Sequence, residues 1–135
     1  HGCLVGSEMC IRDRIKFIDH CEDMALAYKV SDIIVSASIE PEAFGRVAVE
    51  AQSMEKLIIA SNIGGSNETI IDEKTGFLFK SGDAESLSKK IIHGLTMDET
   101  SINLMGKEGR NNIIKKFNVE KMCFSTYSEY KRLLN

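Results

Sequence analysis

Two glutamates, Glu42 and Glu50, stand eight positions apart on either side of Gly45. They belong to a stretch, 36–54, that begins at the end of an apolar run, contains the only proline of the chain and then becomes helix-forming. Where a chain turns from loop into helix, the first backbone N–H groups are unpaired and lie at the positive end of the helix dipole. Such a helix start binds phosphate. The simpler alternative is that Gly45 is needed only for the turn.

The two glutamates differ in their expected surroundings. On a helix that includes Val47, Glu50 falls on the same side as Ala51 and Met54, at the border of an apolar stripe, where a carboxylate needs partners. Facing a crevice, it can accept hydrogen bonds from a vicinal diol such as a ribose. Glu42 lies in the loop before the helix and can meet a sugar ring held at the same helix start. An edge glutamate that reaches water and a plain surface carboxylate remain the alternatives.

The elements that would position these residues alternate between strand and helix. Short apolar runs predict strands at 15–18, 33–35, 57–60 and 77–79, and the second of these should be buried on both faces. Helices are predicted at 23–30 with Asp23 as the N-cap candidate, at 44–54, after the cap Asp83 with Leu87, Ile91 and Leu95 as a stripe, at 101–116 and at 119–134 with an apolar face. This alternation is typical of a Rossmann-like α/β fold with an open, doubly wound parallel sheet.

Two loops follow neighbouring strands of this predicted sheet. The first is 36–45, and the second is 61–67, which contains Gly64 and Gly65. Because ligands bind at the carboxyl ends of the strands in such sheets, the two loops should share one crevice. The glycine pair would let a ligand come close to the backbone, although glycine pairs mostly mark ordinary turns.

Length and composition narrow the class of protein. A chain of 135 residues is expected to form one domain and to bury about two thirds of its unfolded surface. A net charge of -3 with interspersed signs argues against a nucleic-acid binder. The apolar runs are shorter than a membrane span, the first residues lack the order of a signal peptide, and the scattered cysteines and histidines do not form a zinc motif. These features predict a cytoplasmic protein.

The stretch Glu42-Ala-Phe-Gly-Arg-Val-Ala-Val-Glu50 resembles the Glu-x7-Glu motif of retaining glycosyltransferases with the GT-B fold, in particular family 4, the glycosyltransferase group 1. The surroundings resemble that family in order and spacing, namely Ser31-Asp32, Ala37-Ser38, the apolar strand 57–60, Gly64-Gly65, Glu68 and Thr75-Gly-Phe-Leu78. The resemblance runs from about Ile15 to Asn135. It identifies a partial carboxy-terminal, donor-binding domain of a GT-B enzyme.

The resemblance implies three roles within one crevice. Glu42 lies beside the transferred sugar as the catalytic residue, and Glu50 binds the donor ribose. The sugar hydroxyls and the diphosphate contact backbone amides around Phe44, Gly45, Arg46 and Val47, while Gly64 and Gly65 line the same crevice. No metal or other cofactor is expected, because the helix dipole and basic residues neutralise the departing diphosphate.

The resemblance also sets the expected domain organisation. Residues 15–135 form a partial nucleotide-sugar-binding domain, and residues 1–14 do not match what should precede it, so we expect a foreign segment there. The implied partners are a nucleotide-sugar donor, a glycan or lipid-linked acceptor, and an amino-terminal acceptor domain outside this chain, with peripheral membrane association of the full enzyme. The chain alone should be inactive.

Two other classes remain open on the sequence. GT-B architecture also serves epimerases and phosphorylases, so the chain could be a nucleotide-sugar-binding module without transferase chemistry. A non-catalytic αβ domain that binds no nucleotide is the third candidate. Saturable binding of a nucleoside diphosphate separates that third class from the first two.

Overall fold

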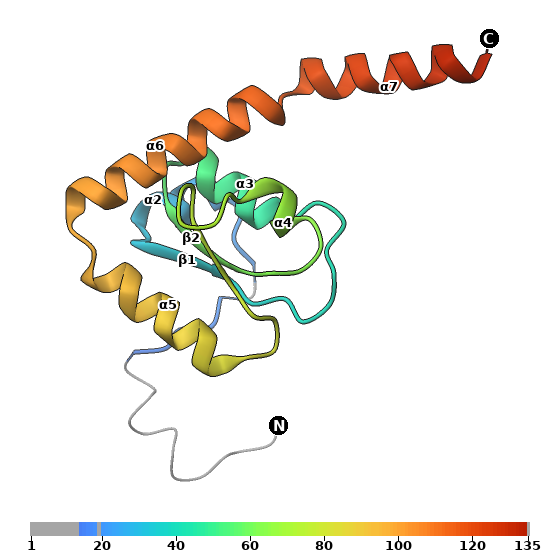
Figure 1. Cartoon of the computed structure of the whole chain (residues 1–135). Coiled ribbons are helices and arrows are strands. Elements are labelled where there is room, and N and C mark those ends of the chain that lie inside the picture. Colours follow the sequence, from blue (N-terminus) through green and yellow to red (C-terminus); the bar gives the residue numbers. More distant parts are fainter. Residues whose placement is uncertain (1–13, 19, 135) are drawn as a thin grey trace.

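The computed structural model describes residues 14–18 and 20–134 and builds them around a small parallel sheet (Figure 1). The sheet has the order β1-β2-β3, with β1 at Ile33–Ser36, β2 at Leu57–Ser61 and β3 at Phe77–Phe79. The helices are α2 (Met24–Val30), α3 (Arg46–Ser53), α4 (Ser66–Thr69), α5 (Ala84–Thr96), α6 (Glu99–Lys116) and α7 (Val119–Leu134). The predicted α/β class and the parallel pairing of the strands are confirmed.

Helices cover both faces of the sheet because alternate residues of a strand point to opposite sides. On one face, Ile58 and Ala60 of β2 join an apolar cluster with residues of α2 and α3. On the other face, Leu57 and Ile59 pack in a second cluster that includes Met105 of α6 and contacts α5. This two-sided cover is the doubly wound arrangement expected from the sequence.

The middle strand and the edge strand differ in burial. Every residue of β2 is buried, as a central strand with helices on both faces should be. Among the strands of the described chain, β1 pairs only with β2, and its burial is incomplete, with Val35 41% exposed. The prediction that 33–35 is buried on both faces is therefore wrong, because in the described chain the helices that pack on both faces of β2 cover this edge strand less completely.

The predicted strand at 15–18 is also wrong. These residues form no strand and are exposed, with Phe17 at 94%. An apolar alternating run becomes a strand only where its N–H and C=O groups find a partner strand. No strand of the described part of the chain pairs with this run.

The helix boundaries follow the capping residues. Asp23 and Asp83 accept hydrogen bonds from the amides of Leu26 and Ser86, at 2.9 and 3.0 Å, as N-cap residues do. Both caps were predicted. The start of α6 was predicted at residue 101, but the carboxylate of Asp98 caps this helix and it begins at Glu99.

The apolar stripes agree only in part with the structure. In α3, Val47, Ala51 and Met54 do pack on the first cluster, but the deepest residues of the helix are Ala48, Ala51 and Gln52. In α5, Leu87 and Ile91 pack against the second cluster while Leu95 is 68% exposed. The four-residue step of α5 therefore carries Leu95 beyond the sheet that the stripe covers.

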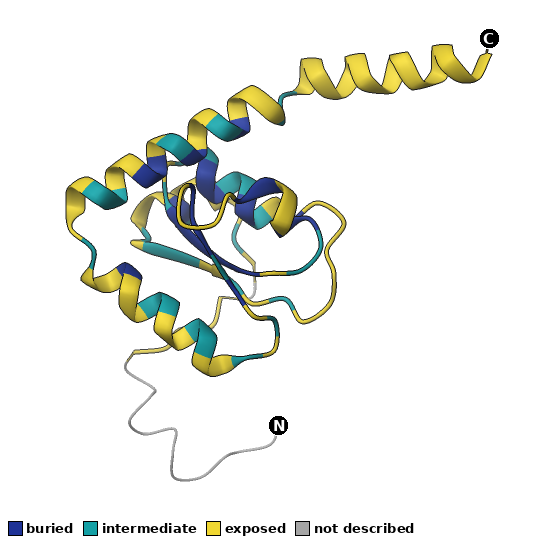
Figure 2. Cartoon of the chain, in the orientation of Figure 1, coloured by how far each residue is buried: buried dark blue, intermediate teal, exposed yellow. Residues whose placement is uncertain are grey.

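The last helix leaves the body of the molecule. α7 extends away from the sheet, and each of its residues is exposed (Figures 1 and 2). Its predicted apolar face exists as a sequence pattern, but among its members Met122, Tyr127 and Tyr130 are 63%, 64% and 65% exposed. The pattern therefore predicts the helix correctly and leaves its partner undefined.

Candidate functional site

The start of α3 has the geometry of an anion site. Gly45 is the N-cap with φ 70° and ψ 58°, a left-handed conformation that favours glycine. Its carbonyl oxygen accepts hydrogen bonds from the amides of Ala48 and Val49, at 3.1 and 3.3 Å, and these bonds form the first turn of the helix. Within residues 14–18 and 20–134, the amides of Gly45, Arg46 and Val47 donate to no protein acceptor. These N–H groups are the unpaired donors that a phosphate would accept from.

The two predicted loops lie against each other. The amide of Gly65 donates to the carbonyl of Glu42 at 2.8 Å. A Cβ atom on Gly64 would lie 2.5 Å from that same carbonyl oxygen, and one on Gly65 would lie 2.5 Å from the carbonyl carbon of Phe44. The predicted adjacency of the loops is thus correct. The glycine pair makes room for the backbone of the other loop, a structural reason that the sequence reasoning missed.

Glu42 is held at the carboxyl edge of the sheet by serines. Its Oε1 accepts a hydrogen bond of 2.5 Å from the hydroxyl of Ser38, while Glu42 itself is exposed. The hydroxyl of Ser81, which follows β3, donates to the carbonyl of Ser38 at 3.2 Å. The loop after β3 therefore contacts the loop 36–45 that carries Glu42. Neither serine was predicted to make these contacts, although each stands shortly after a strand, where such contacts are expected.

Glu50 lies on the side of α3 that faces α2. Its Oε2 accepts a hydrogen bond of 2.8 Å from the hydroxyl of Tyr28, and its Oε1 lies 3.2 Å from a guanidinium nitrogen of Arg46. The Glu50 side chain is 35% exposed, so its predicted place at the border of the apolar stripe is correct. Burial, followed by the hydrogen bond to Glu50, raises the pKa of Tyr28 to about 12.

The predicted site residues form two groups. Glu42, Phe44 and Gly45 meet the Gly64-Gly65 pair where the loops touch. Glu50 instead pairs with Arg46 and accepts a hydrogen bond from Tyr28. Among the described residues, no hydrogen bond or ion pair joins one glutamate to the other.

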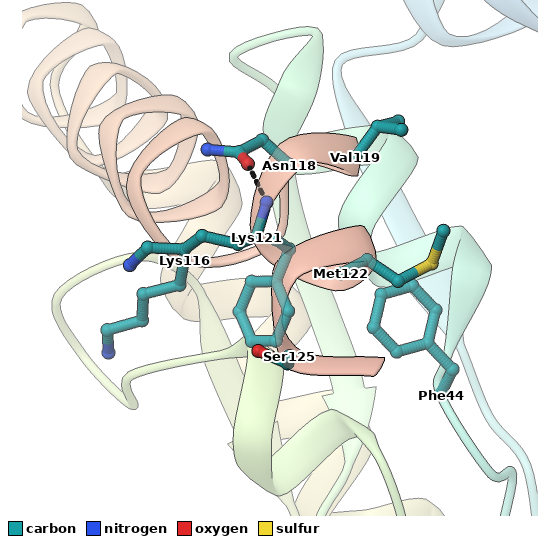
Figure 3. A pocket seen from close by; sticks show the side chains of 8 residues that line it. Phe44, Lys116, Asn118, Val119, Lys121, Met122 and Ser125 are labelled. Atoms are coloured by element: carbon teal, nitrogen blue, oxygen red, sulfur yellow. Dashed lines mark hydrogen bonds between the residues drawn. The ribbon is translucent and has the colours of Figure 1, made fainter. Parts of the chain in front are cut away.

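Phe44 links the first loop to the junction of α6 and α7. Its ring meets that of Phe117 edge to face, with 5.8 Å between the ring centroids. Beside it lies a pocket of about 340 Å³ (Figure 3). The pocket is lined by Phe44, Lys116, Phe117, Asn118, Val119, Lys121, Met122 and Ser125. This contact was not predictable from a sequence pattern, because it depends on where α6 ends.

Residues 14–18 and 20–134 contain neither a cluster of metal ligands nor a membrane-spanning helix. No three side chains of the metal-ligating types gather at one place in that part of the chain. Among its helices, none combines the length and the apolar character that crossing a bilayer requires. The expectation that no metal is needed remains a prediction.

Comparison with known proteins shows the family. Residues 7–112 match the family described as glycosyl transferases group 1. The chain belongs to this family. The match includes the whole Glu42–Glu50 stretch and begins inside the 1–14 segment.

Individual relatives agree with this assignment. The capsular polysaccharide biosynthesis glycosyltransferase CapM of Staphylococcus aureus is 29% identical over 89% of this chain and 31% of its own length. The UDP-Gal:alpha-D-GlcNAc-diphosphoundecaprenol alpha-1,3-galactosyltransferase of Escherichia coli is 30% identical over 85% of this chain and 29% of its length. The crystal structure of a glycosyltransferase from Rickettsia africae ESF-5 is 36% identical, with a TM-score of 0.88, over 96% of this chain and 34% of that one.

These comparisons also identify the fold of the chain. The likeness to the Rickettsia enzyme extends over nearly the whole chain, and the parallel sheet with helices on both faces corresponds to part of the Rossmann-like carboxy-terminal domain of a GT-B glycosyltransferase. The chain spans about a third of the length of the relatives it matches.

Proposed function

We propose that this chain is the donor-binding part of a retaining glycosyltransferase of family 4. The intact enzyme would move a sugar from a nucleoside-diphosphate sugar to a hydroxyl of a glycan or a lipid-linked acceptor. One observation carries the proposal: the family match spans the Glu42–Glu50 stretch, and this stretch surrounds a helix start with unpaired amides.

The order of groups along the chain matches the order of groups in such a donor. A nucleotide sugar consists of a sugar, a diphosphate and a ribose in sequence. Glu42 in the loop would lie beside the sugar, and the amides that follow Phe44 would bind the diphosphate, where the helix dipole favours negative charge. Glu50, one turn further along α3, would accept hydrogen bonds from the ribose hydroxyls.

The reaction needs stabilisation of the leaving group more than it needs a strong base at this site. Departure of the diphosphate and attack by the acceptor hydroxyl would occur on one face of the sugar. Negative charge then develops on the diphosphate, next to the N–H groups at the start of α3. Donors already aimed at developing charge require no rearrangement during the step, and this is the main source of such catalysis.

The names of two relatives support the donor and acceptor classes. The Escherichia coli relative is named for a UDP-linked galactose and for a sugar carried on diphosphoundecaprenol. The Staphylococcus aureus relative is named for capsular polysaccharide biosynthesis. The first name fits a nucleotide-sugar donor with a lipid-linked acceptor, and the second fits the synthesis of a glycan. A cytoplasmic location and peripheral membrane association are part of the same proposal.

Two uncovered surfaces support the further proposal that other parts of the enzyme complete the site. Within residues 14–18 and 20–134, no strand pairs with the outer edge of the apolar strand β1, and such edges are normally paired or covered. α7 exposes Phe124, Tyr127 and Leu133, at 71%, 64% and 75%. We assign these surfaces to the rest of the donor domain and to an amino-terminal acceptor domain. The isolated chain should then transfer no sugar.

The decisive experiment uses the intact protein, meaning the longest natural polypeptide that contains this chain. Calorimetry with UDP, GDP and ADP should show saturable binding of at least one, and the matching nucleotide sugars should support transfer. Glu42→Gln should lower the transfer rate about 100-fold, because the carboxylate beside the sugar is lost while its shape is kept.

Glu40→Gln is the matched control, since Glu40 is an exposed glutamate of the same loop. It should transfer sugar at the wild-type rate. Unchanged transfer by Glu42→Gln would remove Glu42 from the sugar site and favour a binding module without transferase chemistry. No saturable binding of any of the three diphosphates would leave only a non-catalytic αβ domain.

A further inference from the structure

The phenol of Tyr28 is a buried polar group with one partner. Tyr28 lies on α2 and is 4% exposed, and its side chain belongs to the apolar cluster that includes Ala48 and Ala51 of α3. Its hydroxyl donates to Oε2 of Glu50 at 2.8 Å. A buried hydroxyl without a hydrogen bond would cost free energy, so this contact fixes one oxygen of the Glu50 carboxylate.

The other oxygen of Glu50 has a weaker partner. Oε1 pairs with Arg46, whose side chain is 83% exposed and lies one helical turn away. Exposed ion pairs of this spacing contribute little, because water solvates both charges and the long side chain must be held in place. Oε1 is therefore the oxygen that can exchange its partner for a ligand.

We propose that Tyr28 is a positioning residue for donor recognition. It holds Oε2 of Glu50 so that Oε1 accepts a hydrogen bond from the ribose, and the ribose displaces Arg46, whose guanidinium becomes free to meet the diphosphate. This inference rests on the proposed function, because it takes Glu50 as the ribose-binding residue.

The state of the phenol suits this role. Since burial and the neighbouring carboxylate raise the pKa of Tyr28 to about 12, the hydroxyl keeps its proton throughout the neutral range and acts as a donor. A donor at Oε2 leaves Oε1 as an acceptor, which is what a ribose hydroxyl requires. The residue thus selects the orientation of Glu50 without touching the nucleotide.

The test compares ribose with deoxyribose. Calorimetry on the intact protein gives Kd for UDP, GDP and ADP and for the 2′-deoxy form of whichever binds most tightly. Tyr28→Phe removes only the hydroxyl and keeps the ring in the cluster. We expect it to lower the preference for ribose over deoxyribose by about fivefold, the size of one hydrogen bond to a charged group, with the deoxy Kd unchanged.

Tyr127→Phe is the matched control, because Tyr127 is an exposed tyrosine of α7. It should keep the wild-type preference, and melting temperatures of both variants check folding. An unchanged preference in Tyr28→Phe, or an equal loss of both ligands, would overturn the positioning role and leave the proposed function standing. A wild-type protein that binds diphosphates without preferring ribose would overturn the Glu50 assignment. A wild-type protein that binds none of them would overturn both proposals.

Discussion

The two ends of the stretch from Ser36 to Met54 are held in different ways. At the loop end, the backbone of Glu42 and Phe44 touches the backbone at Gly64 and Gly65, and a single added carbon would collide. At the helix end, the carboxylate of Glu50 is contacted by the side chains of Tyr28 and Arg46.

This difference decides how each end responds to change. Two backbones in such close contact leave no room for further atoms, so the loop end is sensitive to any added volume. Side chains can exchange partners, so the helix end can be adjusted one hydrogen bond at a time. Glu42, proposed as the catalytic residue, thus lies at the end where backbones pack, and Glu50, proposed as the ribose contact, lies at the adjustable end.

Gly65→Ala should break the loop end and have the largest effect. The backbone of Gly65 has φ -61°, which alanine adopts freely, so the change tests volume alone. Because the new methyl group would lie 2.5 Å from the carbonyl carbon of Phe44, we expect a loss of about 2 to 3 kcal/mol in the free energy of unfolding. Transfer by the intact protein should also be lost. Urea unfolding and a transfer assay measure both quantities.

Gly82→Ala is the control for that substitution. Gly82 has φ 73°, but a Cβ there would meet nothing within 4 Å. Only the cost of a left-handed alanine remains, about 1 kcal/mol, and transfer should persist. Equal losses in the two variants would mean that the loop contact contributes nothing specific.

The glutamates themselves should separate rate from affinity. Glu50→Gln keeps the size of the side chain but removes the charge that attracts the ribose hydroxyls, so Kd for the donor should rise about tenfold. Glu42→Gln should leave that Kd within about twofold while lowering the rate of transfer, because Glu42 is assigned to the reacting sugar. Calorimetry and steady-state kinetics on both variants test the contrast. A shared loss of affinity would place both glutamates at one subsite.

Much of the loop end was predictable from the sequence. The carboxyl ends of parallel strands lie at one edge, so the meeting of 36–45 with 61–67 follows from topology alone. The N-caps Asp23 and Asp83 were predictable because capping depends only on residues within one helical turn. The purpose of Gly64 was not predictable, because the backbone that crowds it lies about 20 positions away in the sequence.

The helix end and the edges of the fold needed tertiary information. Nothing in the sequence links Tyr28 to Glu50, which lie on different helices. Gln52 is fully buried, with its amide nitrogen donating to the carbonyls of Ala48 and Thr69, although its type predicts a surface position. The wrong predictions of a strand at 15–18 and of two-sided burial at 33–35 share one cause. An apolar pattern indicates that a segment needs a packing partner, but it does not indicate where that partner lies.

The pH dependence of stability should sharpen the account of the helix end. Because the pKa of Tyr28 is raised to about 12 in the folded protein from 10.0, its contribution is fully present below pH 10 and is lost as the pH rises towards 12. The stability difference between wild type and Tyr28→Phe should be constant up to pH 9. Between pH 9 and 11 it should fall by about 1 kcal/mol. Urea unfolding at a series of pH values measures it, and a constant difference would argue against a buried, carboxylate-bound phenol.

Ser38→Ala should have the smallest effect, because it changes a side chain on an otherwise backbone-held loop. The hydroxyl of Ser38 orients the exposed carboxylate of Glu42, whereas the loop itself keeps its contact through Gly65. We expect the transfer rate to fall threefold or less, which corresponds to the free energy of about one exposed hydrogen bond. The free energy of unfolding should not change. Ser81→Ala removes the support one step further away and should cost less. If Ser38→Ala matched Glu42→Gln in its loss of rate, the loop end would depend on side chains as much as the helix end does.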